Sequence, residues 1–129
     1  LLAGDAHADV LEDSLGRLLA LRESERLELD AFKLPHHGSK KNVSRRMVEQ
    51  VSCPRFIFSS NGAYYRHPDR EAVARVIACG QRPESGPQLL FNYRTRFNDV
   101  WDDPHLMERH RYTVSYPEAA SPGIVIDLA

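Results

Sequence analysis

Residues 33–39 read Lys-Leu-Pro-His-His-Gly-Ser, and the rest of the chain is organised around this stretch. Just before the histidines, residues 29–34 show the alternation of side chains that is typical of a strand. Gly38 and Ser39 then open a loop towards a helical segment. The stretch therefore predicts two imidazoles at the exit of a strand, where metal or phosphate chemistry is often found. A surface loop that happens to hold two histidines explains the pair equally well.

Two further strand ends carry metal-ligand side chains. An apolar strand at residues 1–3 ends in Gly4 and Asp5, and a second apolar strand at residues 55–60 leads into a loop that delivers His67. In an open α/β sheet, ligands collect outside the carboxyl ends of the strands. We therefore expect these three strand ends to form one site. Carboxylate and imidazole groups together suit zinc, manganese or iron.

The composition sets limits on partners. At 129 residues the chain is one domain at most, and because it opens at a Leu inside a strand we interpret it as a piece of a longer polypeptide. A formal net charge of -1 gives no bulk attraction to nucleic acid or to a membrane surface, so any phosphate binding must be local. No apolar run approaches the roughly 18 residues that span a bilayer, and we expect no membrane segment.

The two cysteines indicate the compartment. Cys53 and Cys79 are far apart in the sequence and are flanked by apolar residues. This pattern favours buried free thiols over a disulfide, and we therefore predict a cytoplasmic location.

The first 80 residues predict alternating strands and helices. The spacing of leucines over residues 8–22 predicts an amphipathic helix. Ser44 is a candidate N-cap for a short helix over Arg45 to Val51, and Asp69 for a helix that ends at Gly80. The fold class is therefore α/β (or α+β), with strands and helices in alternation.

The last third is less regular. We expect a strand at residues 89–93, a helix over 98–110 that Pro104 interrupts, a short strand at 112–116 and a terminal strand at 123–128.

These residues carry a resemblance to a known family. The chain resembles the C-terminal half of a metallo-β-lactamase-fold hydrolase, closest to the hydrolase domain of competence-type DNA-internalisation proteins. The most specific match is Leu-Pro-His-His-Gly-Ser at 34–39, and Leu-Ala-Gly-Asp at 2–5 resembles the fourth motif of the superfamily. Residues 55–68 resemble the strand, Asn-Gly loop and His-Pro of the fifth motif, and residues 93–95 and 123–126 resemble the closing pair of strands.

The resemblance implies a fold as well. The chain would form half of an αββα sandwich, with a mixed sheet, helices on one face and an insertion at about 96–122. The second-motif His-x-His-x-Asp-His run and the third-motif His of the family are absent from these residues. We therefore expect a missing N-terminal half, in the same polypeptide or in a partner chain, to complete the site.

The resemblance also assigns roles to residues. It implies that Asp5 bridges two metal ions and that His67 is a ligand, with two zinc ions in the complete domain and manganese or iron as alternatives. Adjacent residues of an extended strand point to opposite sides, so at most one of His36 and His37 would face the metal. Parity leaves the choice open; we predict His37 as the ligand. Asp5, His36 and His37 form the predicted catalytic set.

Ser39, Lys40 and Tyr64 are the predicted substrate-binding residues, with nucleic acid as a candidate partner. A solvated helix face and ordinary packing explain the same residues.

Two functions from different classes follow. The first is a metal-dependent hydrolase, a phosphodiesterase or nuclease, in which a metal-bound hydroxide attacks phosphorus. The alternative is a non-catalytic binding or assembly module that keeps the fold. The substrate does not follow from the sequence, because one metal core serves several hydrolytic reactions.

Overall fold

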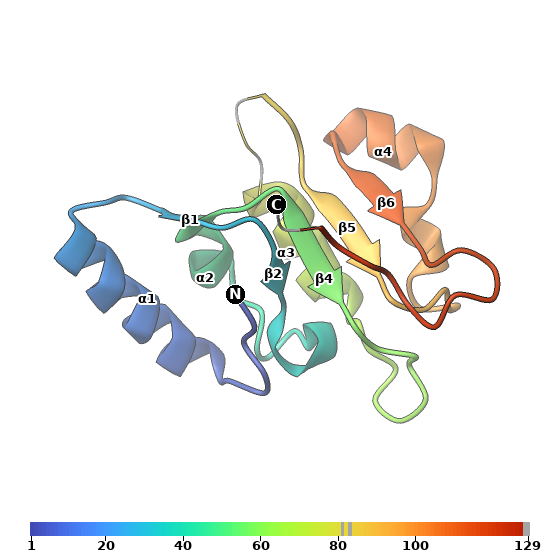
Figure 1. The fold of residues 1–129 in the computed structure, drawn as a ribbon, viewed down its shortest axis with the longest axis horizontal. Coiled ribbons are helices and arrows are strands. Elements are labelled where there is room, and N and C mark those ends of the chain that lie inside the picture. Colours follow the sequence, from blue (N-terminus) through green and yellow to red (C-terminus); the bar gives the residue numbers. More distant parts are fainter. Residues whose placement is uncertain (81, 83, 128–129) are drawn as a thin grey trace.

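A four-stranded parallel sheet forms the centre of the molecule. The structure, a computed structural model, describes residues 1–80, 82 and 84–127. The strands lie in chain order, β2-β4-β5-β6, and each neighbouring pair is parallel. Their bounds are Phe32–Lys33, Arg55–Phe58, Gln88–Phe91 and Thr113–Ser115. All carboxyl ends of these strands consequently point to one edge of the sheet (Figure 1).

Two shorter pairings extend this arrangement. β1 (Leu27–Glu28) pairs with β3 (Val51–Ser52), also in parallel. The first residues of the chain run along β2, where Leu2 forms a parallel bridge with Lys33 and the Lys33 amide donates to the carbonyl of Leu1 at 2.9 Å. This places the end of the residue 1–3 segment beside the end of β2.

Helices connect the strands, and their bounds follow local sequence signals. Ser44 caps α2 as predicted, because its Oγ accepts from the Met47 amide at 3.1 Å. Asp103 caps α4 directly before Pro104, which is where the sequence predicts the break. The helices are α1 (Ala8–Arg22), α2 (Arg45–Glu49), α3 (Arg70–Cys79) and α4 (Pro104–His110), with 3₁₀ turns η1 (Pro35–Gly38) and η2 (Asp99–Trp101).

The core lies between the sheet and its helices. Phe56 and Phe58 alternate with half-buried neighbours along β4 and are fully buried, as is Phe91 on β5, whose ring stacks on Phe58 at 4.8 Å. Each such side chain contributes about 1.5–3 kcal/mol through burial. Helices α2 and α3 supply the facing apolar side chains, among them Met47 and Val76. Figure 1 shows α3 behind β4.

Several predictions for the strands need correction. Every strand pair among the described residues is parallel, so the expected mixed sheet is not found there. The strand expected over 29–34 is confined to β2, because the chain bends at Asp30.

The expected terminal strand is wrong over residues 123–127. Its backbone groups are bound by side chains instead of a ladder: the Ile124 amide donates to Asn92, and the Asp127 carbonyl accepts from Arg55. Residue 128 lies outside the described residues.

Residues 96–122, the expected insertion, contain η2, α4 and β6. β6 is the fourth strand of the sheet, and Trp101, Leu106 and Met107 pack against the core. This segment therefore completes the sheet through β6 and covers part of the core.

Cys53 and Cys79 are both buried and free, as predicted. Burial raises the pKa of each thiol. No helix within the described part of the chain has the length and apolar character needed to cross a membrane.

Candidate metal and substrate site

A cavity of about 530 Å³ opens at the carboxyl ends of β2 and β4. We call it the histidine cavity. Asp5, His36, His37, Tyr64 and His67, all predicted from the sequence as site residues, line it together. The other lining residues are Ser59, Ser60, Asn61, Ala63, Tyr65 and Tyr93. The convergence of the three strand ends is therefore present in the structure.

Asp5 reaches the cavity through the turn that follows the first strand segment. Gly4 has a φ of +57°, which a glycine adopts without steric cost, and its carbonyl accepts from the His36 amide at 2.9 Å. This hydrogen bond links the turn at Gly4 and Asp5 to residues 35–39, which we call the histidine loop. Asp5 itself is exposed, so its carboxylate is accessible to a ligand.

The two histidines share a turn that the sequence did not predict. β2 ends at Lys33, and His36 and His37 have φ values of 45° and 57°, followed by Gly38 at 87°. Left-handed conformations are costly for non-glycine residues and cluster at functional sites. Because the backbone curls instead of staying extended, the imidazoles do not diverge to opposite sides. Both line the cavity, with ring centroids 6.3 Å apart, so the expected divergence is not found, and His37 as the metal ligand stays a prediction.

Gly38 fixes the position of this turn. A Cβ on Gly38 would lie 2.8 Å from the ring of Phe58 and 2.9 Å from Pro68. Its carbonyl accepts from the Asp69 amide at 3.0 Å. The histidine loop is consequently packed against the end of β4 and against the loop that carries His67.

His67 is the most buried of the cavity histidines, at 9% exposure. Its ring lies 5.6 Å from that of His36 and is stacked on Tyr65 at 5.9 Å, measured between centroids. Burial lowers the pKa of His67, with the Asp69 carboxylate opposing the shift and the His36 and His37 rings adding to it. His67 is therefore held towards its neutral form, which is the form that binds metal ions.

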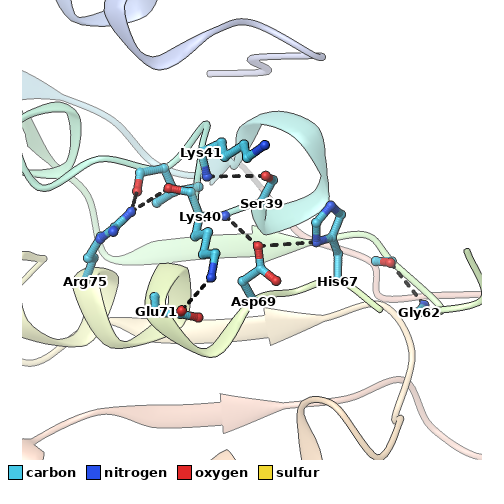
Figure 2. A network of polar contacts seen from close by, with 10 residues as sticks. Ser39, Lys40, Lys41, Gly62, His67, Asp69, Glu71 and Arg75 are labelled. Atoms are coloured by element: carbon cyan, nitrogen blue, oxygen red, sulfur yellow. Dashed lines mark hydrogen bonds and ion pairs between the residues drawn. The ribbon is translucent and has the colours of Figure 1, made fainter. Parts of the chain in front are cut away.

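Ser39 and Lys40, predicted to bind substrate, are not in the cavity lining. Ser39 is buried, and its Oγ accepts from the Lys41 amide at 3.3 Å. Lys40 donates its amide to Asp69 and its Nζ to Glu71, both at 2.8 Å (Figure 2). Lys40 thus holds the histidine loop to the start of α3, whereas Ser39 bonds within its own segment of the chain.

The loop after β4 contributes residues that motif reasoning did not assign to the site. Ser59 Oγ lies within hydrogen-bonding distance of His37 Nδ1, at 3.3 Å. Ser60 and Asn61 turn the chain, because their side chains accept from the amides of Gly62 and Ala63 at 3.0 Å each. Their position directly after a strand was the available signal.

Three tyrosines stand at the cavity with much of their surface exposed. Tyr64 is 92% exposed, Tyr65 is 74% exposed and Tyr93 is 44% exposed. Large aromatic side chains in such positions provide flat surfaces on which a ligand ring can stack.

The donor groups of the cavity bear on the predicted zinc ions. One carboxylate and three imidazoles are groups that zinc prefers. The buried Nδ1 of His67 has no hydrogen-bond partner within bonding distance and faces the Asp69 carboxylate at 3.7 Å, so Nε2 is the ring nitrogen that remains for a ligand. Among residues 1–80, 82 and 84–127, however, no three His, Cys, Asp or Glu side chains are grouped so that they could hold a metal ion. The donors fit zinc in kind, and a complete coordination shell requires further ligands.

Compared with protein-family models, curated proteins and solved structures, the chain matches none of them. The residues that line the histidine cavity and the motif resemblance are therefore the basis for a functional proposal.

Proposed function

We propose that this chain is the C-terminal half of a metal-dependent hydrolase of the metallo-β-lactamase type, acting as a phosphodiesterase or nuclease. The observation that supports the proposal is the meeting of Asp5, His36, His37 and His67 at one cavity at the carboxyl ends of parallel strands. These residues come from three separate segments of the sequence, and none of them belongs to the hydrophobic core.

Asp5, His37 and His67 would hold the zinc ions. A missing N-terminal half, in the same polypeptide or in a partner chain, would complete the set of ligands. When bound, zinc supplies Lewis-acid activation of water and stabilises negative charge on the phosphoryl oxygens. Ser59 beside His37 and Asp69 beside His67 orient the two ligand rings.

His36 is the residue best placed to handle a proton. Its ring makes edge contacts with the rings of His37 and His67, at centroid distances of 6.3 and 5.6 Å. An imidazole in this position can protonate the leaving oxygen of a phosphodiester. In this proposal His36 acts on substrate while the flanking histidines serve as ligands.

The exposed tyrosines support a substrate position beside their rings. Tyr64 and Tyr65 project from the loop after β4, and Tyr93 follows β5, so they border the cavity from two sides. Their rings can stack on the bases of a single-stranded nucleic acid. Stacking suits a chain whose net charge of -1 offers no general attraction to phosphate.

A non-catalytic binding module is the second candidate. It is favoured by the absence, within the described residues, of a group of three side chains able to hold a metal. Such a module would use the same tyrosines to bind a partner without cleaving it.

One experiment separates the two candidates. In the full-length protein we expect about two transition-metal ions per chain and hydrolysis of a generic phosphodiester such as bis(4-nitrophenyl) phosphate. Asp5→Ala should lose metal and lower the rate by at least about a hundredfold. The matched control is Asp30→Ala, which removes another exposed carboxylate outside the cavity. A full-length protein that binds no metal after careful reconstitution would exclude the hydrolase.

A further inference from the structure

Asp69 lies between the histidine loop and the loop that carries His67. It precedes α3 as the N-cap residue, yet its side chain makes no capping hydrogen bond, contrary to the sequence prediction. Its Oδ2 instead accepts from the Lys40 amide at 2.8 Å and lies 3.7 Å from Nδ1 of His67 (Figure 2). One carboxylate oxygen therefore faces both the loop that carries His36 and His37 and the loop that carries His67.

The contact with His67 determines where a proton is placed on the ring. Nδ1 of His67 is buried and has no hydrogen-bond partner within bonding distance, which is costly for a polar atom. If Nδ1 carried a lone pair, it would face the negative Oδ2 of Asp69. If Nδ1 carries the proton, a shift of less than 1 Å brings it into a charge-assisted hydrogen bond of about 2.8 Å. The second arrangement is the favourable one.

We propose that Asp69 is a positioning residue for the histidine cavity. Its carboxylate holds His67 in the Nδ1–H tautomer, so that Nε2 keeps a lone pair for a ligand. The same carboxylate fixes the distance between the histidine loop and the loop that carries His67. The first part concerns the protein alone; its consequence for catalysis rests on the proposed hydrolase function.

Neighbouring charges do not share this role. Glu71 belongs to the same network, but its carboxylate pairs with Nζ of Lys40, which is exposed. Arg75 donates to the carbonyls of Lys40 and Val43 at 2.6 and 2.7 Å, and so holds the same loop from α3. Glu71→Gln is accordingly a matched control, because it changes the network without touching His67.

The test measures the tautomer directly. Long-range ¹H–¹⁵N correlation spectra of the metal-free, full-length protein at about pH 8 report which ring nitrogen of a neutral histidine carries the proton, above the ordinary imidazole pKa of about 6.5. His67→Gln identifies the signal of His67. We expect the Nδ1–H pattern in the unmodified protein and in Glu71→Gln, and a shift towards Nε2–H, the tautomer ordinarily preferred in water, in Asp69→Ala.

Hydrolysis gives the second measurement. We expect kcat for the generic phosphodiester to fall about tenfold to a hundredfold in Asp69→Ala and to be unchanged in Glu71→Gln. Nε2–H on His67 in the unmodified protein, or the same tautomer with and without Asp69, would overturn the proposal. If Asp69→Ala does not fold, the tautomer in the unmodified protein decides. A tautomer shift in a protein without any hydrolysis would refute the proposed function and leave the positioning role intact.

Discussion

The ends of β4 and β5 lie side by side at the same edge of the sheet, and polar residues follow both strands. The two regions differ in whether those polar groups bond within the protein or face the histidine cavity. After β5, residues 94–98 form what we call the Asn98 turn, and Tyr93 just before it lines the histidine cavity. Asn98 is fully buried, accepts from the Thr95 amide at 2.9 Å and donates to the Tyr93 carbonyl at 2.8 Å. Arg94 pairs with Asp102, and its guanidinium lies 3.9 Å above the ring of Tyr116.

The histidine cavity, at the ends of β2 and β4, shows the opposite pattern. Asp5 is exposed, and His36 and His37 lie in left-handed backbone conformations. Nδ1 of His67 is buried without a hydrogen bond. Backbone strain and unused polar groups are tolerated where function requires them. We therefore predict that the Asn98 turn contributes mainly to stability, whereas the residues of the histidine cavity serve the proposed function.

The comparison is tested most strongly by removing each loop histidine. Both rings line the cavity, so His36→Ala and His37→Ala should each lower the hydrolysis rate of the full-length protein by about a hundredfold, the upper range for losses next to a metal. The free energy of unfolding should change little. Phosphodiester assays and urea titrations measure the two effects.

His105→Ala is the control for these variants, because His105 is exposed on α4. A loss confined to one of the two loop histidines would show that the rings are not equivalent in solution, as an extended strand would make them.

Asn98→Ala should have the converse effect. It leaves the Thr95 amide and the Tyr93 carbonyl without their partner, and should lower the free energy of unfolding by about 2–3 kcal/mol. The rate per folded molecule should be largely retained. Urea unfolding measures the change. Asn61→Ala is the matched control, since Asn61 is an exposed asparagine in the loop after β4. Equal losses of stability in both variants would remove the distinction between the loops.

Tyr116→Phe gives the smallest effect. It removes the hydrogen bond from the hydroxyl to the Asn98 carbonyl, 3.0 Å long, at a cost of about 1 kcal/mol near neutral pH. Burial raises the pKa of Tyr116 to about 12, with Arg94 opposing the shift. Between about pH 10 and pH 12 the unfolded chain therefore loses this proton while the folded protein keeps it, so stability falls as pH rises.

The fall should be less steep in Tyr116→Phe. Thermal unfolding at several pH values between 9 and about 11.5 measures both slopes. Parallel slopes for the two proteins would show that Tyr116 is as free to ionise in the folded state as in the unfolded chain.

Much of the fold could be predicted from the sequence because local signals were strong. The leucine spacing predicted α1 with the observed bounds, Ser44 marked the start of α2, and Pro104 marked the break between η2 and α4. The bend at Asp30 and the unpaired segment 123–127 were missed, because they depend on bonds to distant groups, such as the contact between Arg55 and the Asp127 carbonyl.

The candidate site was predictable in its members more than in its geometry. Asp5, the two loop histidines and His67 were expected together, because parallel strands bring their ends to one edge. The left-handed turn at His36 was not, since non-glycine residues rarely adopt it and only packing imposes it. The roles of Lys40 and Asp69 depend on a contact between residues 29 positions apart, which no local pattern indicates.

The close fit of Gly38 against Phe58 has a consequence for motion. Phe58 is part of the stacked core, and the carbonyl of Gly38 holds the Asp69 amide, so the histidine loop cannot lift away without disturbing the sheet. Its opening should therefore require nearly the free energy of global unfolding, and the Asp69 amide should exchange with solvent deuterium about as slowly as the core. The neighbouring loop with Tyr64 and Tyr65, largely exposed, can open at far lower cost. The side of the cavity formed by His36 and His37 should thus be rigid, and the side formed by Tyr64 and Tyr65 should be mobile.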